Sequence, residues 1–137
     1  MRILMVVRPA AGGMKEHVLA LSQGLVGDGH AVEIAAPAGS DVSAAAREAG
    51  FVVHEIPLVG PLHPMRDPQA ISALRRVLVA RDYDVVHAHG FKAGLVARLA
   101  VALVSASKRP CMVVTAHNHV LFRDDTPAST KRRYRLV

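Results

Sequence analysis

Glycine and histidine residues gather at three places that lie far apart in this sequence. They are Gly12 and Gly13, His89 and Gly90, and the segment 117–119, which reads His-Asn-His. Paired glycines before a helix let a ligand approach the backbone, and the free N–H groups of the helix start favour an anion such as phosphate. A histidine such as His117 can donate a hydrogen bond to a ligand hydroxyl or to developing charge. A tight turn at the glycines and a structural histidine at 117 are the simpler alternatives.

Two common nucleotide-binding motifs are absent from the chain. Where a dinucleotide-binding fingerprint would need G-x-G-x-x-G, the sequence reads A-A-G-G-M-K, and the second predicted strand ends at Ala36-Pro37 without an acidic residue. The phosphate-binding loop G-x-x-x-x-G-K-[ST] is also missing. We therefore expect neither NAD or FAD binding nor ATP or GTP hydrolysis by that loop.

Two groups of residues could suggest a metal, and we expect none and no cofactor. Asp82-Tyr83-Asp84 spells D-x-D but precedes a predicted strand, at the edge of the sheet opposite the glycines and histidines. The other group lacks a cysteine or carboxylate to complete a tetrahedral zinc site, and its members alternate along the chain. It consists of His87, His89, His117 and His119.

Three further histidines have ordinary explanations. His17 falls on a predicted helix, His30 in a turn and His54 in a predicted edge strand, so solvent exposure or local hydrogen bonding accounts for them. We assign them no chemistry.

The elements that must position these residues alternate between short β-branched runs and helical periods, which is typical of βα units on a parallel sheet. Helices are predicted where apolar residues recur at spacings of three and four, as at Met14, Val18, Leu21 and Leu25. A short Ala-rich helix starts at Ser40 or Asp41, a proline-rich loop covers 57–68, and a last helix starts at 128. The five predicted strands are 2–7, 31–36, 51–56, 84 to 87 or 88, and 111–115.

This pattern predicts an α/β fold, a Rossmann-like doubly wound parallel sheet of order 3-2-1-4-5 with helices on both faces. Ligands of such sheets bind outside the carboxyl ends of the strands, where the strand order reverses. The three glycine and histidine groups follow strands one, four and five. They should therefore meet at one edge of the sheet.

Composition fits one domain over residues 1–137. The chain is 51% hydrophobic and 20% charged, and no apolar stretch is long enough to span a bilayer. Its single cysteine, Cys111, lies in an apolar run, so we expect a buried thiol and a cytoplasmic location.

The net charge of +6 is concentrated near the C-terminus, in a cluster that could face phosphates, nucleic acid or anionic lipid. Nucleic acid is disfavoured, because the chain has no tryptophan, few other aromatic residues and no nucleic-acid-binding motif. A solvated helix face is the simpler alternative. The cluster consists of Lys131, Arg132, Arg133 and Arg135.

Five segments occur in order at the predicted strand and loop positions: M-R-I-L-M-V-V, G-G-M-K-E-H-V-L-A-L-S-Q-G-L, G-H-A-V-E-I-A-A-P, D-V-V-H-A-H-G and V-V-T-A-H-N. In this order and spacing they resemble the N-terminal half of family 4 retaining glycosyltransferases, over nearly the whole chain. The resemblance implies one Rossmann-like half of a two-domain GT-B fold. It also implies transfer of a hexose-type sugar from a nucleotide diphosphate sugar to an acceptor sugar or lipid-linked glycan, with retention and no required metal.

The resemblance also implies roles for individual residues. Gly12 and Gly13 look like the loop that nears the donor diphosphate and the acceptor, and His117 looks like the catalytic histidine that contacts the transferred sugar. His89, Gly90 and Asn118 would line the acceptor side. Arg8 and Lys15 are weaker candidates for added positive charge near the loop.

The second, donor-binding domain of this family has no counterpart in the sequence. Because its Arg and Lys pair would stabilise the leaving diphosphate, we expect this acceptor-side domain to be inactive alone. The basic C-terminal cluster would fit peripheral contact with the inner face of a membrane. Two alternatives stay open: half of a GT-B sugar-nucleotide epimerase, and a non-catalytic binding module or subunit of a split glycosyltransferase.

Overall fold

Runs of Val, Ile, Leu and Ala form the five parallel strands of the sheet. The computed structural model describes residues 1–10, 12–60 and 63–117. The strand order β3-β2-β1-β4-β5 confirms the predicted topology. The strands are β1 (Arg2–Val7), β2 (Ala31–Ala36), β3 (Val52–Glu55), β4 (Val85–His89) and β5 (Cys111–Thr115).

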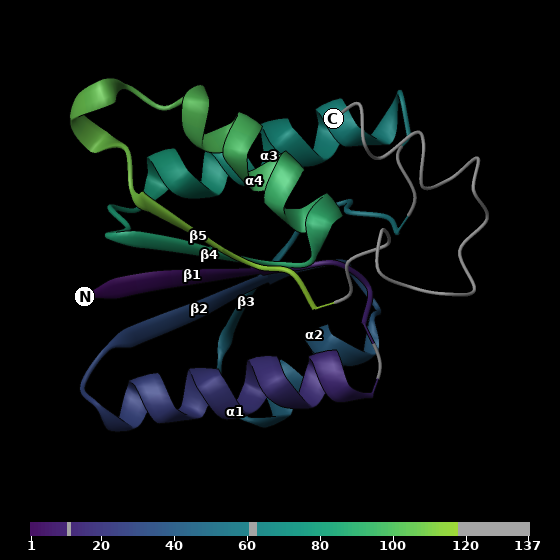
Figure 1. Ribbon diagram of the computed structural model, residues 1–137, viewed down its shortest axis with the longest axis vertical. Helices are drawn as coiled ribbons and strands as arrows, with labels where there is room; N and C mark the ends of the chain where they lie inside the picture. The colour runs from purple at the N-terminus through teal and green to yellow at the C-terminus, as the bar shows by residue number, and fades with distance from the viewer. Residues whose placement is uncertain (11, 61–62, 118–137) are drawn as a thin grey trace.

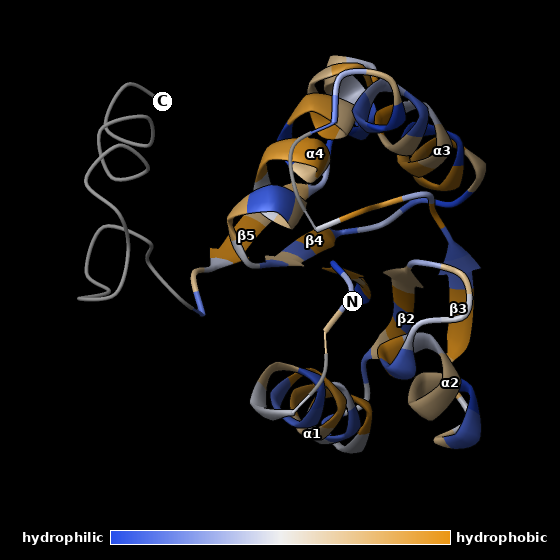
Figure 2. Cartoon of the chain, turned by 90° about the vertical axis from the view of Figure 1, so that its right-hand side faces the viewer, coloured by the Kyte–Doolittle hydropathy of each residue, from blue (hydrophilic) through white to orange (hydrophobic). Residues whose placement is uncertain are grey.

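Helices connect the strands and cover both faces of the sheet. Figure 1 shows α1 and α2 on one face and α3 and α4 on the other, as the prediction requires. Figure 2 shows the same two helical layers from the side, with apolar residues along the strands between them. The helices are α1 (Gly13–Gly27), α2 (Asp41–Glu48), α3 (Arg66–Ala80) and α4 (Phe91–Ala102), and a 3-10 turn (Ala106–Lys108) precedes β5.

Alternation along the strands divides the core in two, because successive side chains of a strand point to opposite faces. On β1, Leu4 and Val6 pack with α3 and α4, while Met5 and Val7 pack with α1 and α2. All four side chains are fully buried. β1 is therefore the centre of both cores, and its carboxyl end is fixed between them.

Local signals explain where the helices begin. Ser40 caps α2, because its Oγ accepts a hydrogen bond from the N–H of Ser43 at 3.3 Å. α3 begins at Arg66, inside the segment predicted as a loop. Pro68 falls in its first turn, where the missing N–H removes no helical hydrogen bond. Pro68, predicted as the end of a loop, thus belongs to the first turn of the helix.

A charged residue lies inside the sheet, within the second predicted strand. Glu33 of β2 is 7% exposed, and its carboxylate accepts hydrogen bonds from Tyr83 Oη at 2.7 Å, His54 Nε2 at 2.5 Å and Arg81 Nη1 at 2.7 Å. Burial raises the pKa of Glu33, but the hydrogen bonds from His54 and Tyr83 and the charge of Arg81 outweigh it and hold this pKa below its usual value. We call Glu33, His54, Arg81 and Tyr83 the Glu33 network.

The D-x-D tripeptide has a structural role at the amino ends of the strands. Asp84 Oδ2 accepts a hydrogen bond from the N–H of Arg2 at 2.7 Å, and Tyr83 belongs to the Glu33 network. The residues precede β4, as predicted, and lie away from the carboxyl edge.

The expectation of a buried thiol is wrong. Cys111 is exposed, because it begins β5, which lies at the edge of the sheet. An apolar run alone cannot distinguish an edge strand from a central one. Among the described residues, no helix is long and apolar enough to cross a membrane. The predicted helix from 128 and the basic cluster lie outside the described residues.

Candidate functional site

The carboxyl ends of β1, β4 and β5 lie in register at one edge of the sheet. Val7 pairs with His89, and His89 pairs with Thr115. The N–H of Gly90 donates a hydrogen bond to the carbonyl of Thr115 at 2.8 Å, just past the ends of the strands. The loops that follow these three strands therefore start side by side, as the strand order predicted.

Gly12 forms the turn from the first loop into α1. Its φ of 60° and ψ of −139° require glycine, since side chains strain this region. A Cβ added at Gly12 or Gly13 would meet no atom within 4 Å among its surroundings, so the space in front of this loop is open. A ligand can therefore approach the backbone and the N–H groups of the first turn.

Gly90 forms the corresponding turn into α4. Its φ is 89°, and a Cβ at this position would lie 3.4 Å from Arg8 Nε and 3.6 Å from Met14 Cε. Gly90 is buried beneath these two side chains. The close fit brings the Arg8 side chain, from the loop after β1, over the end of β4.

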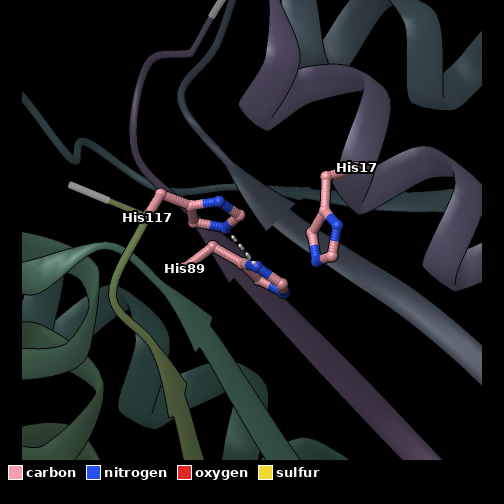
Figure 3. A group of neighbouring side chains, drawn as sticks. All are labelled: His17, His89 and His117. Carbon is pink, nitrogen blue, oxygen red and sulfur yellow. Dashed lines mark hydrogen bonds between the residues drawn. The ribbon is translucent and has the colours of Figure 1, made fainter.

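His89 and His117 are joined at the centre of this edge. His89 Nδ1 and His117 Nε2 are 3.0 Å apart. Figure 3 shows this hydrogen bond, which joins the last residue of β4 to the segment after β5. His89 is fully buried, whereas His117 is partly exposed. His117 is thus the member that can reach a ligand, and His89 holds its ring.

Burial favours the neutral form of these imidazoles. Burial, with the nearby His87, His117 and His17, lowers the pKa of His89 to about 3. Burial and the neighbouring His17 and Arg8 lower the pKa of His117. At neutral pH both rings therefore act as hydrogen-bond partners without charge, each with one donor and one acceptor nitrogen.

Two more histidines complete the cluster. His87 lies two residues before His89 on β4. Its Nε2 is 2.7 Å from Thr115 Oγ1, and its ring centroid is 4.2 Å from that of His89. His17 of α1 has its ring centroid 5.0 Å from His117 and 5.9 Å from His89. The sequence reasoning assigned His17 no chemistry, although it lies three residues after Met14 and four before Leu21. That spacing puts it beside the helix face that packs on the sheet, where its side chain stays exposed.

A buried ion pair ties α3 to α4 beside the same edge. Lys92 Nζ contacts Asp67 Oδ1 at 2.5 Å, and Lys92 is only 5% exposed. Burial raises the pKa of Asp67, but its hydrogen bond from Lys92 outweighs this and the pKa is lowered. The pair fixes the first turn of α3 against the first turn of α4.

The remaining candidates are distributed as follows. Asn118 and His119 lie outside the described residues, and Lys15 pairs with Glu16 at 3.3 Å in the first turn of α1. An open hollow of about 590 Å³ lies at the ends of β2 and β3 and the start of α3. None of the predicted site residues lines it. The candidate site therefore consists of the glycine loop and the histidines.

The sequence matches the model of glycosyltransferase family 4 over residues 11–137. This match covers most of the chain and includes the glycine loop and the histidines at positions 89 and 117. No curated protein matches the sequence.

Several solved structures share the fold. A glycosyltransferase from Rickettsia africae superposes with a TM-score of 0.71 at 18% identity, covering 97% of this chain and 33% of the other. MurG from Acinetobacter baumannii gives 0.66 at 18%, covering 96% and 39%, and the glycotransferase of kitacinnamycin gives 0.63 at 19%, covering 98% and 34%. The chain thus spans about two fifths or less of these proteins.

Proposed function

Because the chain belongs to glycosyltransferase family 4, we propose that it is the acceptor-side domain of a GT-B enzyme that transfers a hexose-type sugar from a nucleotide diphosphate sugar, with retention. The observation that carries the proposal is the meeting of an open glycine turn with a neutral, partly exposed histidine at one sheet edge. The acceptor is a sugar or lipid-linked glycan. Transfer requires a donor domain and no metal.

The glycine turn supports a place for the diphosphate and the acceptor. The first N–H groups of α1 have no helical partner and carry the positive end of the helix dipole. Gly12 and Gly13 leave the space in front of these groups open. A phosphate oxygen or an acceptor hydroxyl can therefore approach them at hydrogen-bond distance.

His117 acts on the transferred sugar. Its Nε2 is held by His89, and the His117 side chain is partly exposed. A neutral ring held in this way is preorganised to exchange a hydrogen bond with a sugar hydroxyl. The full burial of His89 and Gly90 favours a positioning role for both, beneath the acceptor. Asn118 remains a prediction for the acceptor side.

The leaving diphosphate needs more positive charge than this domain supplies. The Arg8 side chain lies against Gly90, and Lys15, in the first turn of α1, is paired with Glu16. We therefore propose that the chain binds the donor weakly and is inactive alone. A cytoplasmic location and contact of the basic cluster with a membrane surface also remain predictions.

His117→Ala tests the assigned role, with His30→Ala as the matched control far from the site. In protein that contains the donor domain, H117A should lower kcat by about 10²- to 10³-fold, the usual cost of losing one transition-state hydrogen bond. H30A should leave kcat unchanged. The anomeric configuration of the product, read by NMR, tests retention. Equal kcat values for H117A and the parent would contradict the role.

A further inference from the structure

Three histidines from three different elements converge at the carboxyl edge. Each of His17, His89 and His117 offers one ring nitrogen, and these nitrogens lie within 4.8 Å of one another. Figure 3 shows the rings facing one another, with His17 reaching down from α1. The four histidines for which we expected no metal did not include His17.

One atom in this group lacks a partner that a core histidine normally has. His89 is fully buried, its Nδ1 pairs with His117, and its Nε2 has no hydrogen-bond partner among the described residues. Leaving a buried polar nitrogen unpaired is unfavourable, because the atom has lost its hydrogen bonds to water without gaining a protein partner. If the Nδ1–H of His89 donates to His117, Nε2 carries a bare lone pair, which is the form that binds a metal ion.

We infer that His17, His89 and His117 form a site for a divalent metal ion of borderline softness, of which Zn²⁺ is the main biological example. Imidazole nitrogens suit Zn²⁺, Cu²⁺ and Ni²⁺ better than the harder Mg²⁺ or Ca²⁺. Three protein nitrogens leave a fourth position for water or a ligand.

The geometry requires only a small adjustment. Zn–N bonds of about 2.0–2.1 Å in a tetrahedron place ligand nitrogens roughly 3.3 Å apart. The three nitrogens lie within 4.8 Å of one another, so the widest separation must shorten by up to about 1.5 Å. His17 is exposed on α1, so its side chain is the one free to move inward.

Local charge limits the affinity. The group contains no carboxylate, and Arg8 acts as a positive charge on His117. His87 stands behind His89, bonded to Thr115. A bound dication thus has no anionic ligand to offset its charge. We expect binding in the micromolar range, in the manner of a regulatory or inhibitory ion.

Metal binding would compete with sugar transfer. The ion would take the His117 ring that is assigned to the transferred sugar, so Zn²⁺ should inhibit transfer and a chelator should restore it. This consequence rests on the proposed function, whereas metal binding itself does not.

The test is a titration of the untagged protein with Co²⁺, whose tetrahedral complexes absorb visible light strongly, followed by displacement with Zn²⁺ and calorimetry. One ion should bind per chain. His17→Ala should weaken binding at least tenfold, because it removes one ligand from the helix surface and leaves the core intact; His117→Ala should do the same.

Two control variants remove other metal-binding side chains. His30→Ala and Cys111→Ser, both outside the cluster, should bind Co²⁺ like the parent. No Co²⁺ absorption, binding that survives H17A, or binding lost in H30A or C111S would overturn the inference. Because the readout is binding, a lack of transferase activity would count against the proposed function alone.

Discussion

Replacing Glu33 by Gln should destabilise the fold severely, although the side chain keeps its shape. Hydrogen bonds to a charged group contribute about 1.5–3 kcal/mol each, and Glu33 receives two from the buried Tyr83 and the partly buried His54. Arg81 is 44% exposed, so its pair contributes less than about 1 kcal/mol. The Gln amide retains part of this bonding. We expect a loss of about 2–4 kcal/mol of unfolding free energy.

The effect should depend on pH with a defined sign. The folded-state pKa of Glu33 is lowered from 4.5, so its contribution is complete above that value and is lost as the pH falls through the folded-state pKa. The stability difference between the parent and E33Q should therefore shrink on acidification below about pH 4.5. Urea denaturation at a series of pH values measures both quantities.

Glu55→Gln is the matched control. Glu55 pairs with Arg47, and both side chains are about half exposed. Its removal should change stability by less than about 0.5 kcal/mol at neutral pH. If E33Q were no more destabilising than E55Q, or if its effect grew in acid, the account of a charged network inside the sheet would be refuted.

Three glycine substitutions test the backbone, each by thermal denaturation. Gly24→Ala should stabilise the protein by about 0.5–1 kcal/mol, because the added Cβ on this exposed turn of α1 meets no atom within 4 Å; a lower Tm would contradict this. Gly94→Val should cost about 1–3 kcal/mol, because its Cβ would lie 3.0 Å from Val114 Cγ1 where α4 meets β5; an unchanged Tm would show that Val114 yields. Gly90→Ala should cost about 1–3 kcal/mol through its φ of 89°, and parental stability would argue against that turn.

Much of the sheet could be predicted from the sequence because its strands are short apolar runs with clear boundaries. The bounds 2–7, 31–36 and 111–115 are those observed. Pro37 and Gly39 stop the second strand, and right-handed crossovers restrict the order of the strands. The start of α3 was missed because Pro68 signals a loop and a first helical turn equally.

The site could be predicted only as a meeting of loops. Topology placed His89 and His117 at one edge, and their contact at 3.0 Å agrees with that. Burial could not be predicted: strand pattern alone does not reveal that His89 is enclosed, or that Glu33 is held inside the sheet by residues up to 50 positions away. His17 is exposed, as expected, and its place beside His89 and His117 was missed because it depends on how α1 packs on the sheet.

A calorimetric titration of this chain with UDP, GDP and a panel of their sugars tests the proposed function. The titration is made with the chain alone and after adding or fusing a candidate donor domain, and a transfer assay follows. The proposed function predicts that tight binding and sugar transfer appear only with the second domain present. Tight nucleotide binding by this chain alone would contradict it and would identify a self-sufficient binding module.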